Sequence, residues 1–363
     1  MYNVALEILN ILECNGYKTY IVGGFVRNKL LGIINNDIDI ITSAKPIEIR
    51  NIFNIHNKDN YGSIKLLYKG FKFDITTFRK ESNYLDNRWP INIEYVTTLE
   101  EDLKRRDFTI NSICIDKDGN YIDLLDGISD LNNKLIRCIG NCSLKLKEDS
   151  LRILRAIRFA SIYNMKLSNE LEESIRQNSS LIRNLSFDRI KSELNLIFSS
   201  FNCNYGISII NDLGLSEILE IELKNTIIPT GNYLSVWSQI NYSNKYNFSN
   251  KEKKIINEIR SILKIGYIDE YILYNYDFSN VEEAACILKI DDDLYNIYNN
   301  LVIHCKSDID ITYDELTNLV SNVNINDIYV DLEKQILYNK LKNKKDFIIS
   351  YINYKYKEGE KNE

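Results

Sequence analysis

The chain has 363 residues, 44% of them hydrophobic and 26% charged, with a formal net charge of −6. This composition is ordinary for a globular protein with a sizeable core, and no apolar run reaches the roughly 18 residues that a transmembrane helix needs. The seven cysteines lack zinc-ligand or disulfide-framework spacing, and the amphipathic, acidic N-terminus is unlike a signal peptide. We therefore expect a cytoplasmic protein without a membrane segment.

The first predicted element is a strand from Thr19 to Val22, which ends at Gly23 and Gly24. The following segment, FVRNKLL, has helical spacing. Glycines between a strand and a helix let the backbone approach a phosphate closely, and the helix N-terminus presents free N–H groups. Arg27, one turn into this helix, can add a cation to the same site. Two glycines alone are more often only a tight turn.

A carboxylate pair follows in the segment DIDI, which the flanking isoleucines indicate to be a short buried strand. Because residues i and i+2 of a strand share one face, Asp37 and Asp39 point the same way, roughly 7 Å apart. Two carboxylates so close repel each other unless a cation lies between them. They suit Mg²⁺, which is held by one or two carboxylates and substrate phosphates. For an isolated DxD, an Asp-rich turn is the commoner alternative.

The next elements are a hairpin and a polar segment. Two alternating stretches flank Lys69-Gly70, and Asp74 lies in the second of them, where it is either a third carboxylate of the same site or a solvent-facing residue. Residues Lys80 to Ile93 are polar and contain a proline, and we expect a mobile loop with Arg88 as a basic candidate. From about residue 141 onward, apolar periods of three to four predict helices.

These segments resemble one known family. The strings GGFVRN, DIDI, FDITTFR, EEDLKRRDFTINSI and KEDSLRILRAIRFAS are similar, in order and spacing, to the motifs of class II tRNA nucleotidyltransferases. That family comprises the CCA-adding enzymes and bacterial poly(A) polymerases. The resemblance implies an α/β head with a polymerase-beta-like mixed sheet, followed by all-α neck, body and tail domains. We expect a catalytic head at residues 1–140, a nucleotide-selecting neck at 141–200 and a tRNA-binding body and tail at 201–363.

The resemblance also implies roles for single residues. Asp37 and Asp39 would hold Mg²⁺, with Asp74 as the third catalytic carboxylate. The residues expected to bind the nucleotide are Gly23, Gly24 and Arg27 at the triphosphate, Arg106, Asp107 and Asn111 near ribose and triphosphate, and Asp149, Arg152, Arg155 and Arg158 in the neck.

Within that set, Asp149 and Arg152 match the pair that reads the Watson–Crick edge of the incoming base. An Asp accepts from an exocyclic amino group, and an Arg donates to a ring acceptor. Both C and A present this combination, whereas G and U present the opposite polarity. Without the other motifs, the arginines at three-residue steps would be read as a basic surface helix.

Three features bear on the activity. The family pattern reads GGxVRD, with Asp at the position where this chain has Asn28. The segment after residue 80 has the full length of the corresponding family loop, which favours complete CCA addition. The acidic total leaves the C-terminal segment, with Lys340, Lys345 and Lys355 among tyrosines, as the main basic stripe or as a solvated helix. Neither His56 nor His304 is followed by Asp, so an HD hydrolase module is not expected.

The predicted function is template-independent addition of CCA, from CTP and ATP, to the 3′ end of tRNA by two-metal phosphoryl transfer with release of pyrophosphate. The alternatives are a poly(A) polymerase, an A-adding enzyme of the same family, and a non-catalytic RNA-binding relative. No protein partner is evident from the sequence.

Overall fold

The computed structural model describes residues 1–55, 61–85, 89–224, 226–320 and 323–357, so His56 and Arg88 lie outside the described residues. The chain divides into two compact units. Unit 1 comprises Met1–Ile227 and Asn241–Asn247, and unit 2 comprises Ile228–Ile240 and Phe248–Glu363.

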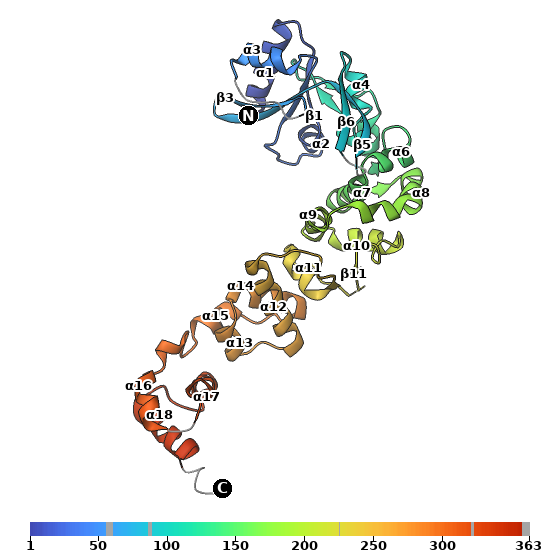
Figure 1. Ribbon diagram of the computed structural model, residues 1–363. Helices are drawn as coiled ribbons and strands as arrows, with labels where there is room; N and C mark the ends of the chain where they lie inside the picture. Colours follow the sequence, from blue (N-terminus) through green and yellow to red (C-terminus); the bar gives the residue numbers. More distant parts are fainter. Residues whose placement is uncertain (56–60, 86–88, 225, 321–322, 358–363) are drawn as a thin grey trace. The chain divides into compact units, whose positions relative to one another are not determined.

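Unit 1 begins with strands and helices mixed and continues as helices (Figure 1). Its strands are β1 (Thr19–Val22), β2 (Asp39–Thr42), β3 (Ser63–Tyr68), β4 (Phe71–Thr77), β5 (Arg79–Leu85), β6 (Trp89–Tyr95), β7 (Cys114–Ile115), β8 (Tyr121–Ile122), β9 (Leu135–Ile136), β10 (Lys166–Leu167), β11 (Ile221–Glu222) and β12 (Asn241–Tyr242). Its helices are α1 (Tyr2–Cys14), α2 (Gly24–Leu30), α3 (Pro46–Phe53), α4 (Leu99–Leu103), α5 (Gly127–Asn132), α6 (Cys142–Glu148), α7 (Leu151–Tyr163), α8 (Asn169–Asn178), α9 (Phe187–Phe198) and α10 (Cys203–Asp212), with 3₁₀ turns at Thr109–Asn111 and Ser179–Asn184.

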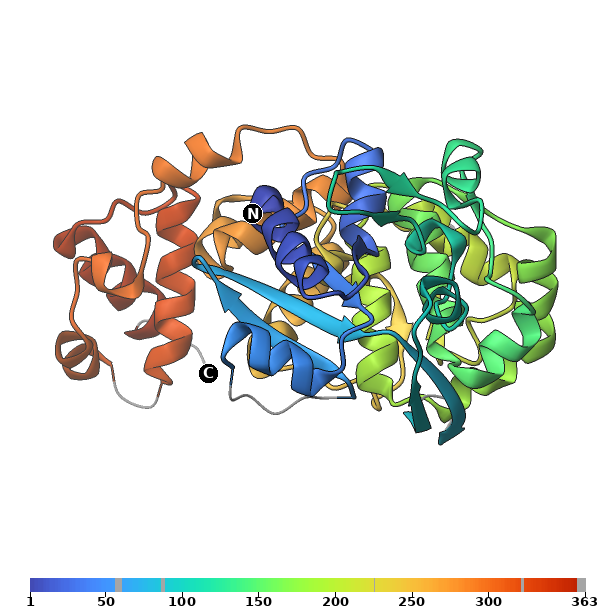
Figure 2. The same cartoon turned by 90° about the horizontal axis from the view of Figure 1, so that it is seen from above.

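The central sheet has the order β3-β4-β2-β1-β7-β8 and is mixed, because β2 and β4 are parallel while the other neighbours are antiparallel. Helix α1 packs against β1 and β2, and α3 packs against β3. Figure 2 shows both helices alongside the β3–β4 hairpin. Buried apolar residues such as Val22, Ile41 and Phe78 join this sheet to α4. The predicted mixed α/β head followed by helices is confirmed.

The segment after β4 differs from the expected mobile loop. Strands β5 and β6 form an antiparallel hairpin in which Arg79 pairs with Tyr95 and Lys80 pairs with Glu94. Polar composition and Pro90 suggested a loop, but a two-stranded ladder is held by backbone hydrogen bonds, which side-chain polarity does not reveal.

Unit 2 is helical throughout its described part and is built around an isoleucine- and leucine-rich core. Its elements are α11 (Tyr233–Gln239), α12 (Asn250–Ile265), α13 (Glu270–Asn275), α14 (Phe278–Leu288), α15 (Leu294–Asn299), a 3₁₀ turn (Lys306–Asp308), α16 (Tyr313–Leu319), α17 (Ile325–Leu337), α18 (Lys345–Ile352) and a final π turn (Asn353–Lys357). Helix α12 illustrates the local rules: a Ser249–Glu252 capping box begins it and Gly266 with φ of 84° ends it.

The expected basic stripe at the C-terminus is partly neutralised. Lys345 forms an ion pair with Glu315, and Lys355 forms one with Asp331 at 2.8 Å. Within the described chain, no helix combines the length and the apolar run needed to cross a bilayer.

Candidate active site

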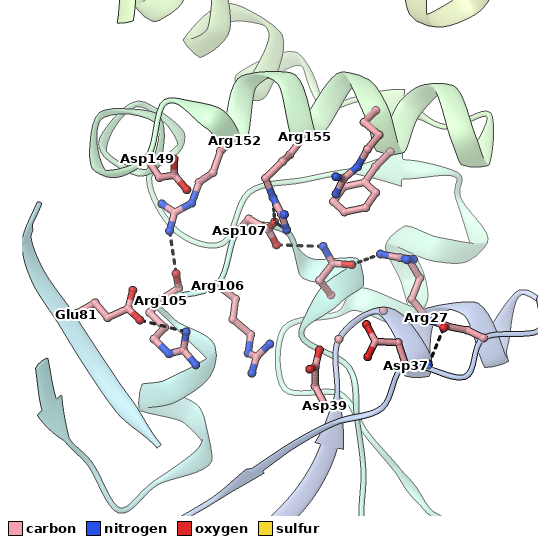
Figure 3. Close-up of a pocket in the computed structure, with 16 residues that line it drawn as sticks. Arg27, Asp37, Asp39, Glu81, Arg105, Arg106, Asp107, Asp149, Arg152 and Arg155 are labelled. Carbon is pink, nitrogen blue, oxygen red and sulfur yellow. Dashed lines mark hydrogen bonds and ion pairs between the residues drawn. The ribbon is translucent and has the colours of Figure 1, made fainter. Parts of the chain in front are cut away.

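A pocket of about 520 Å³ in unit 1 contains nearly every residue that the sequence singled out (Figure 3). It is lined by Gly23, Gly24, Arg27, Asn35, Asp37, Asp39, Glu81, Arg105, Arg106, Asp107, Asn111, Asp149, Arg152, Arg155, Arg158 and Phe159. Of the predicted site residues, only Asp74 is outside this lining. The pocket therefore brings together motifs that span more than a hundred residues of sequence.

Asp39 is the first residue of β2, whereas Asp37 precedes the strand, so the prediction that both carboxylates share one face of a buried strand is wrong. Asp39 is the register partner of Val22 on β1 and of Asp74 on β4, so the glycine turn and the third carboxylate are its direct neighbours. Desolvation, followed by the negative charge of Asp37, is the main cause that raises the pKa of Asp39 to about 6. The charge of Asp74 adds to this effect and the Arg106 cation opposes it. Among the described residues no ion pair of Asp39 offsets this negative charge, and carboxylates gathered in this way attract a cation.

The carboxylate oxygens of Asp37 and Asp39 suit a metal ion, but further donor atoms must come from a bound ligand. In the described ranges, no group of three or more His, Cys, Asp or Glu side chains is arranged to hold a metal by itself. Mg²⁺ is usually bound by one or two carboxylates together with substrate phosphates, so an open pair at Asp37 and Asp39 is compatible with that ion. All seven cysteines are free in the structure.

The glycine turn lies against the carboxylates. Gly23 has φ of 83°, a left-handed conformation that favours glycine, and a Cβ placed there would lie 3.4 Å from Asp39 Oδ2. At Gly24 an added Cβ would lie 3.6 Å from Arg27 Nη2. Side chains at these positions would therefore fill the space between the carboxylates and Arg27.

The RRD motif is held by ion pairs rather than by a continuous helix. Asp107 and Asn111 do not share an α-helical face, since only Thr109–Asn111 forms a 3₁₀ turn, yet Asn111 Nδ2 donates to Asp107 Oδ1 at 3.0 Å. Asp107 also accepts from Arg155 Nε and Nη2, at 2.9 and 2.5 Å. These contacts outweigh burial and hold the pKa of Asp107 far below its usual range. The carboxylate is thus ionised and orients both neighbours.

Arg106 contributes a different feature. Its Nη2 is 3.4 Å from Asp102 Oδ2, while its Nε is buried without a hydrogen-bond partner among the described residues. A buried donor of this kind is a position where an anionic ligand atom would be stabilised.

The neck residues lie at the opposite side of the pocket, at the start of α7 (Figure 3). Asp149 Oδ1 accepts the backbone N–H of Leu151 at 3.1 Å. Arg152 is only 6% exposed, and its Nη1 donates to Glu148 Oε2 at 2.8 Å. Its Nη2 donates to the carbonyl of Arg105 at 3.1 Å. The guanidinium is therefore fixed in place beside Asp149.

Several pocket residues were not predicted as site residues. Phe159 lies among arginines, with its ring centre 4.9 Å from Arg27 Cζ and 4.5 Å from Arg158 Cζ. An aromatic within the string RAIRF was a usable signal for such cation–π contacts. Glu81 lies in the misread loop segment, and nothing in its local sequence indicated that it would reach the pocket.

The chain is similar to known proteins along its whole length. Residues 19–137 match the Poly A polymerase head domain, and residues 164–225 match the probable RNA and SrmB-binding site of polymerase A. The CCA-adding enzyme of Staphylococcus haemolyticus is 30% identical over 97% of this chain and 98% of its own. That of Ligilactobacillus salivarius is 32% identical over 96% and 95%.

Closer identity occurs over a shorter part. The CCA-adding enzyme of Lactobacillus johnsonii is 42% identical over 60% of this chain. In that comparison the chain spans about half (55%) of the relative's length. The fold agrees with that of the Bacillus stearothermophilus CCA-adding enzyme in complex with CTP, with a TM-score of 0.83, 23% identity and coverage of 99% and 98%. Because relatives that are at least 30% identical match nearly the full length of the chain, the chain belongs to the family of CCA-adding enzymes, which are tRNA nucleotidyltransferases.

Proposed function

We propose that this chain adds CCA to the 3′ end of tRNA from CTP and ATP, without a nucleic-acid template, and that the unit 1 pocket performs both the chemistry and the choice of nucleotide. One observation carries the proposal. A single pocket contains the carboxylates of Asp37, Asp39 and Asp149 together with six arginines, one of which is the fixed Arg152. Such a combination suits an incoming nucleoside triphosphate, whose two ends differ in chemistry.

Nucleotidyltransferases of this family are generally metal-dependent, and we propose Mg²⁺ as the metal. Asp37 and Asp39 would hold it, with Asp74 as the neighbouring third carboxylate. When bound, the ion supplies Lewis-acid polarisation of phosphoryl oxygens and lowers the pKa of an attacking hydroxyl.

The protein's own residues bind and orient the nucleotide in this proposal. The glycine turn leaves room for phosphates, and the unsatisfied Nε of Arg106 is available to a phosphate oxygen. Asp107 acts by orienting Asn111 and Arg155 toward ribose and phosphate. Because little covalent chemistry is required of the protein, positioning and charge stabilisation account for most of its contribution.

Base choice is assigned to Asp149 and Arg152. An ionised Asp can accept from the amino group of C or A, and an Arg can donate to the adjacent ring nitrogen. The contacts of Arg152 with Glu148 and with the Arg105 carbonyl hold its guanidinium in one orientation. A fixed donor discriminates between bases better than a mobile one, since a wrong base leaves it unpaired.

The remaining assignments are coarser. We propose that residues 201–363 bind the tRNA body and that the enzyme works in the cytoplasm, where free cysteines stay reduced. The family architecture supports the first assignment.

The test is incorporation of labelled CTP and ATP, separately and together, into a tRNA transcript lacking CCA and into an unrelated RNA. Ordered addition of two Cs and one A to the tRNA alone is the expected result. Repeated addition of A to either RNA would establish a poly(A) polymerase. Absence of incorporation by folded protein with Mg²⁺ would favour the non-catalytic alternative.

A further inference from the structure

The position of Asp37 in the pocket is not set by the central sheet. Strand β2 begins at Asp39, and residues 33–38 belong to no helix or strand. The ladder that pairs Asp39 with Val22 and Asp74 begins at the same residue. Asp37 nevertheless lines the pocket, and Figure 3 shows it at the same end as Asp39. A contact other than strand pairing must therefore hold it there.

The charges of the two carboxylates make such a contact necessary. After burial, the negative charge of Asp37 is the largest cause that raises the pKa of Asp39. Asp37 is exposed, so repulsion from Asp39 favours turning its side chain away into solvent while no cation lies between the two. A loop residue stays beside a like charge only where its backbone is restricted.

Asn35 supplies this restriction. Its Oδ1 accepts the backbone N–H of Asp37 at 2.9 Å, which is an Asx turn, where a side chain replaces a backbone acceptor. The other end of the same amide lies at the glycine turn, because a Cβ added to Gly24 would be 3.8 Å from Asn35 Nδ2. The half-buried Asn35 side chain therefore spans the space between the glycine turn and Asp37.

The next residue in the chain, Asn36, differs in each of these respects. It has the same side chain in the same loop, but it is exposed and does not line the pocket. The contact with Asp37 is thus specific to Asn35 and is not a general property of an asparagine-rich loop.

We propose that Asn35 is a positioning residue, whose side-chain carbonyl holds the backbone at Asp37 so that the Asp37 carboxylate stays beside Asp39 to share a divalent cation. The presence of that cation rests on the proposed function. Asn35 acts on the cation only through Asp37, because its oxygen is directed at the Asp37 backbone N–H. A carboxylate that is already in place loses less conformational freedom when an ion binds, so the Asx turn favours binding.

The first experiment measures binding of Mn²⁺, a paramagnetic substitute for Mg²⁺, by electron paramagnetic resonance without nucleotide or RNA. The relevant site is the one that is lost in Asp37→Ala. Asn35→Ala removes the acceptor and should weaken this site by about threefold to tenfold, as expected for the loss of one hydrogen bond. Asn35→Ser keeps a weaker acceptor and should lie between Asn35→Ala and wild type. Asn36→Ala is the matched control and should bind Mn²⁺ as wild type does.

The outcomes separate this inference from the function on which it rests. Equal Mn²⁺ affinity of Asn35→Ala and wild type would overturn the inference, as would an equal loss in Asn36→Ala. In an Asp37→Ala background, Asn35→Ala should cause no further loss, and a further loss would show that Asn35 does not act through Asp37. If wild type and Asp37→Ala bind Mn²⁺ equally, the proposed metal assignment itself fails, and the inference fails with it.

A second measurement separates positioning of Asp37 from direct binding of the nucleotide. Calorimetric titration with CTP in EDTA should give the same affinity for Asn35→Ala and wild type, because only the cation depends on the placement of Asp37. In steady-state incorporation, the Mg²⁺ concentration for half-maximal rate should rise about threefold to tenfold in Asn35→Ala, while KM for CTP at saturating Mg²⁺ stays unchanged. Weaker CTP binding by Asn35→Ala in EDTA would assign Asn35 to the nucleotide and contradict the positioning role.

Discussion

The two units of this chain use buried charge differently. Among the described residues, unit 1 buries six charged side chains, namely Arg27, Asp102, Asp107, Asp130, Arg152 and Glu193, whereas unit 2 buries Glu333 alone. Burying charge is unfavourable unless partners are arranged for it, and three of the six, Arg27, Asp107 and Arg152, line the pocket. Unit 2 is instead held by apolar packing, which is typical of a helical scaffold.

The largest expected effect concerns the unit 1 carboxylates. Asp39→Asn keeps the shape of the side chain but removes its charge, and should reduce incorporation by roughly a thousandfold or more. Steady-state incorporation with Mg²⁺ measures this effect, and circular dichroism shows whether the variant is folded. Asp118→Asn, at an exposed turn, is the control and should behave as wild type. A folded Asp39→Asn protein with near wild-type activity would contradict the assignment of catalysis to the unit 1 carboxylates.

A core substitution in unit 2 should affect stability without affecting the pocket. Ile259→Ala, at a fully buried position, should destabilise the protein by about 2–5 kcal/mol. Urea unfolding measures the loss, and CTP binding below the transition should be unchanged because the pocket is built from unit 1. Ile175→Ala in unit 1 is the matched comparison. Loss of CTP binding by still-folded Ile259→Ala would show that nucleotide binding depends on unit 2.

A smaller effect is expected at the base-reading pair. Arg152→Lys removes the planar fork while keeping the charge, and should lower discrimination between CTP and UTP by about 1–3 kcal/mol. Ratios of kcat/KM for the two nucleotides report it. Arg176→Lys, on the exposed face of α8, should leave the ratio unchanged. An unchanged ratio in Arg152→Lys would place base choice elsewhere.

The smallest effect concerns the surface of unit 2. The Lys345 ammonium and the Thr312 N–H lower the pKa of Glu315 to about 2 from 4.5. A carboxyl whose pKa is lowered on folding stabilises the protein above its unfolded pKa, and this stabilisation is lost as pH falls from about 4.5 toward 2. Lys345→Ala should therefore lower Tm slightly at pH 7, with the difference from wild type shrinking below pH 4.5. A difference that grows in acid would contradict this sign.

Much of the site followed from local sequence. The strand Thr19–Val22, the DIDI carboxylates and the hairpin around Lys69-Gly70 are set by alternation and glycine punctuation, which a single sequence displays. The helices after residue 141 follow from apolar periodicity. These are short-range patterns, and the structure confirms them except at Asp37, which precedes β2.

The rest depends on contacts between distant residues. Tyr163 meets Arg27 across 136 positions, and Glu81 reaches Arg105 across 24, so no local spacing predicts either contact. The prediction of a loop at the β5–β6 hairpin was wrong, because polar side chains give no sign of the backbone hydrogen bonds that pair the two strands. The sequence of unit 2 shows why helices form, but it contains no catalytic or ligand-binding motif. The tRNA-binding role proposed for unit 2 therefore comes from family architecture.

The most direct test of the account is equilibrium binding of CTP, ATP, GTP and UTP to the wild-type protein without any RNA. If the fixed Asp149–Arg152 pair in the unit 1 pocket chooses the nucleotide, CTP and ATP should bind clearly more tightly than GTP and UTP. Equal binding of all four, or a preference that arises only when tRNA is added, would contradict selection by the protein alone.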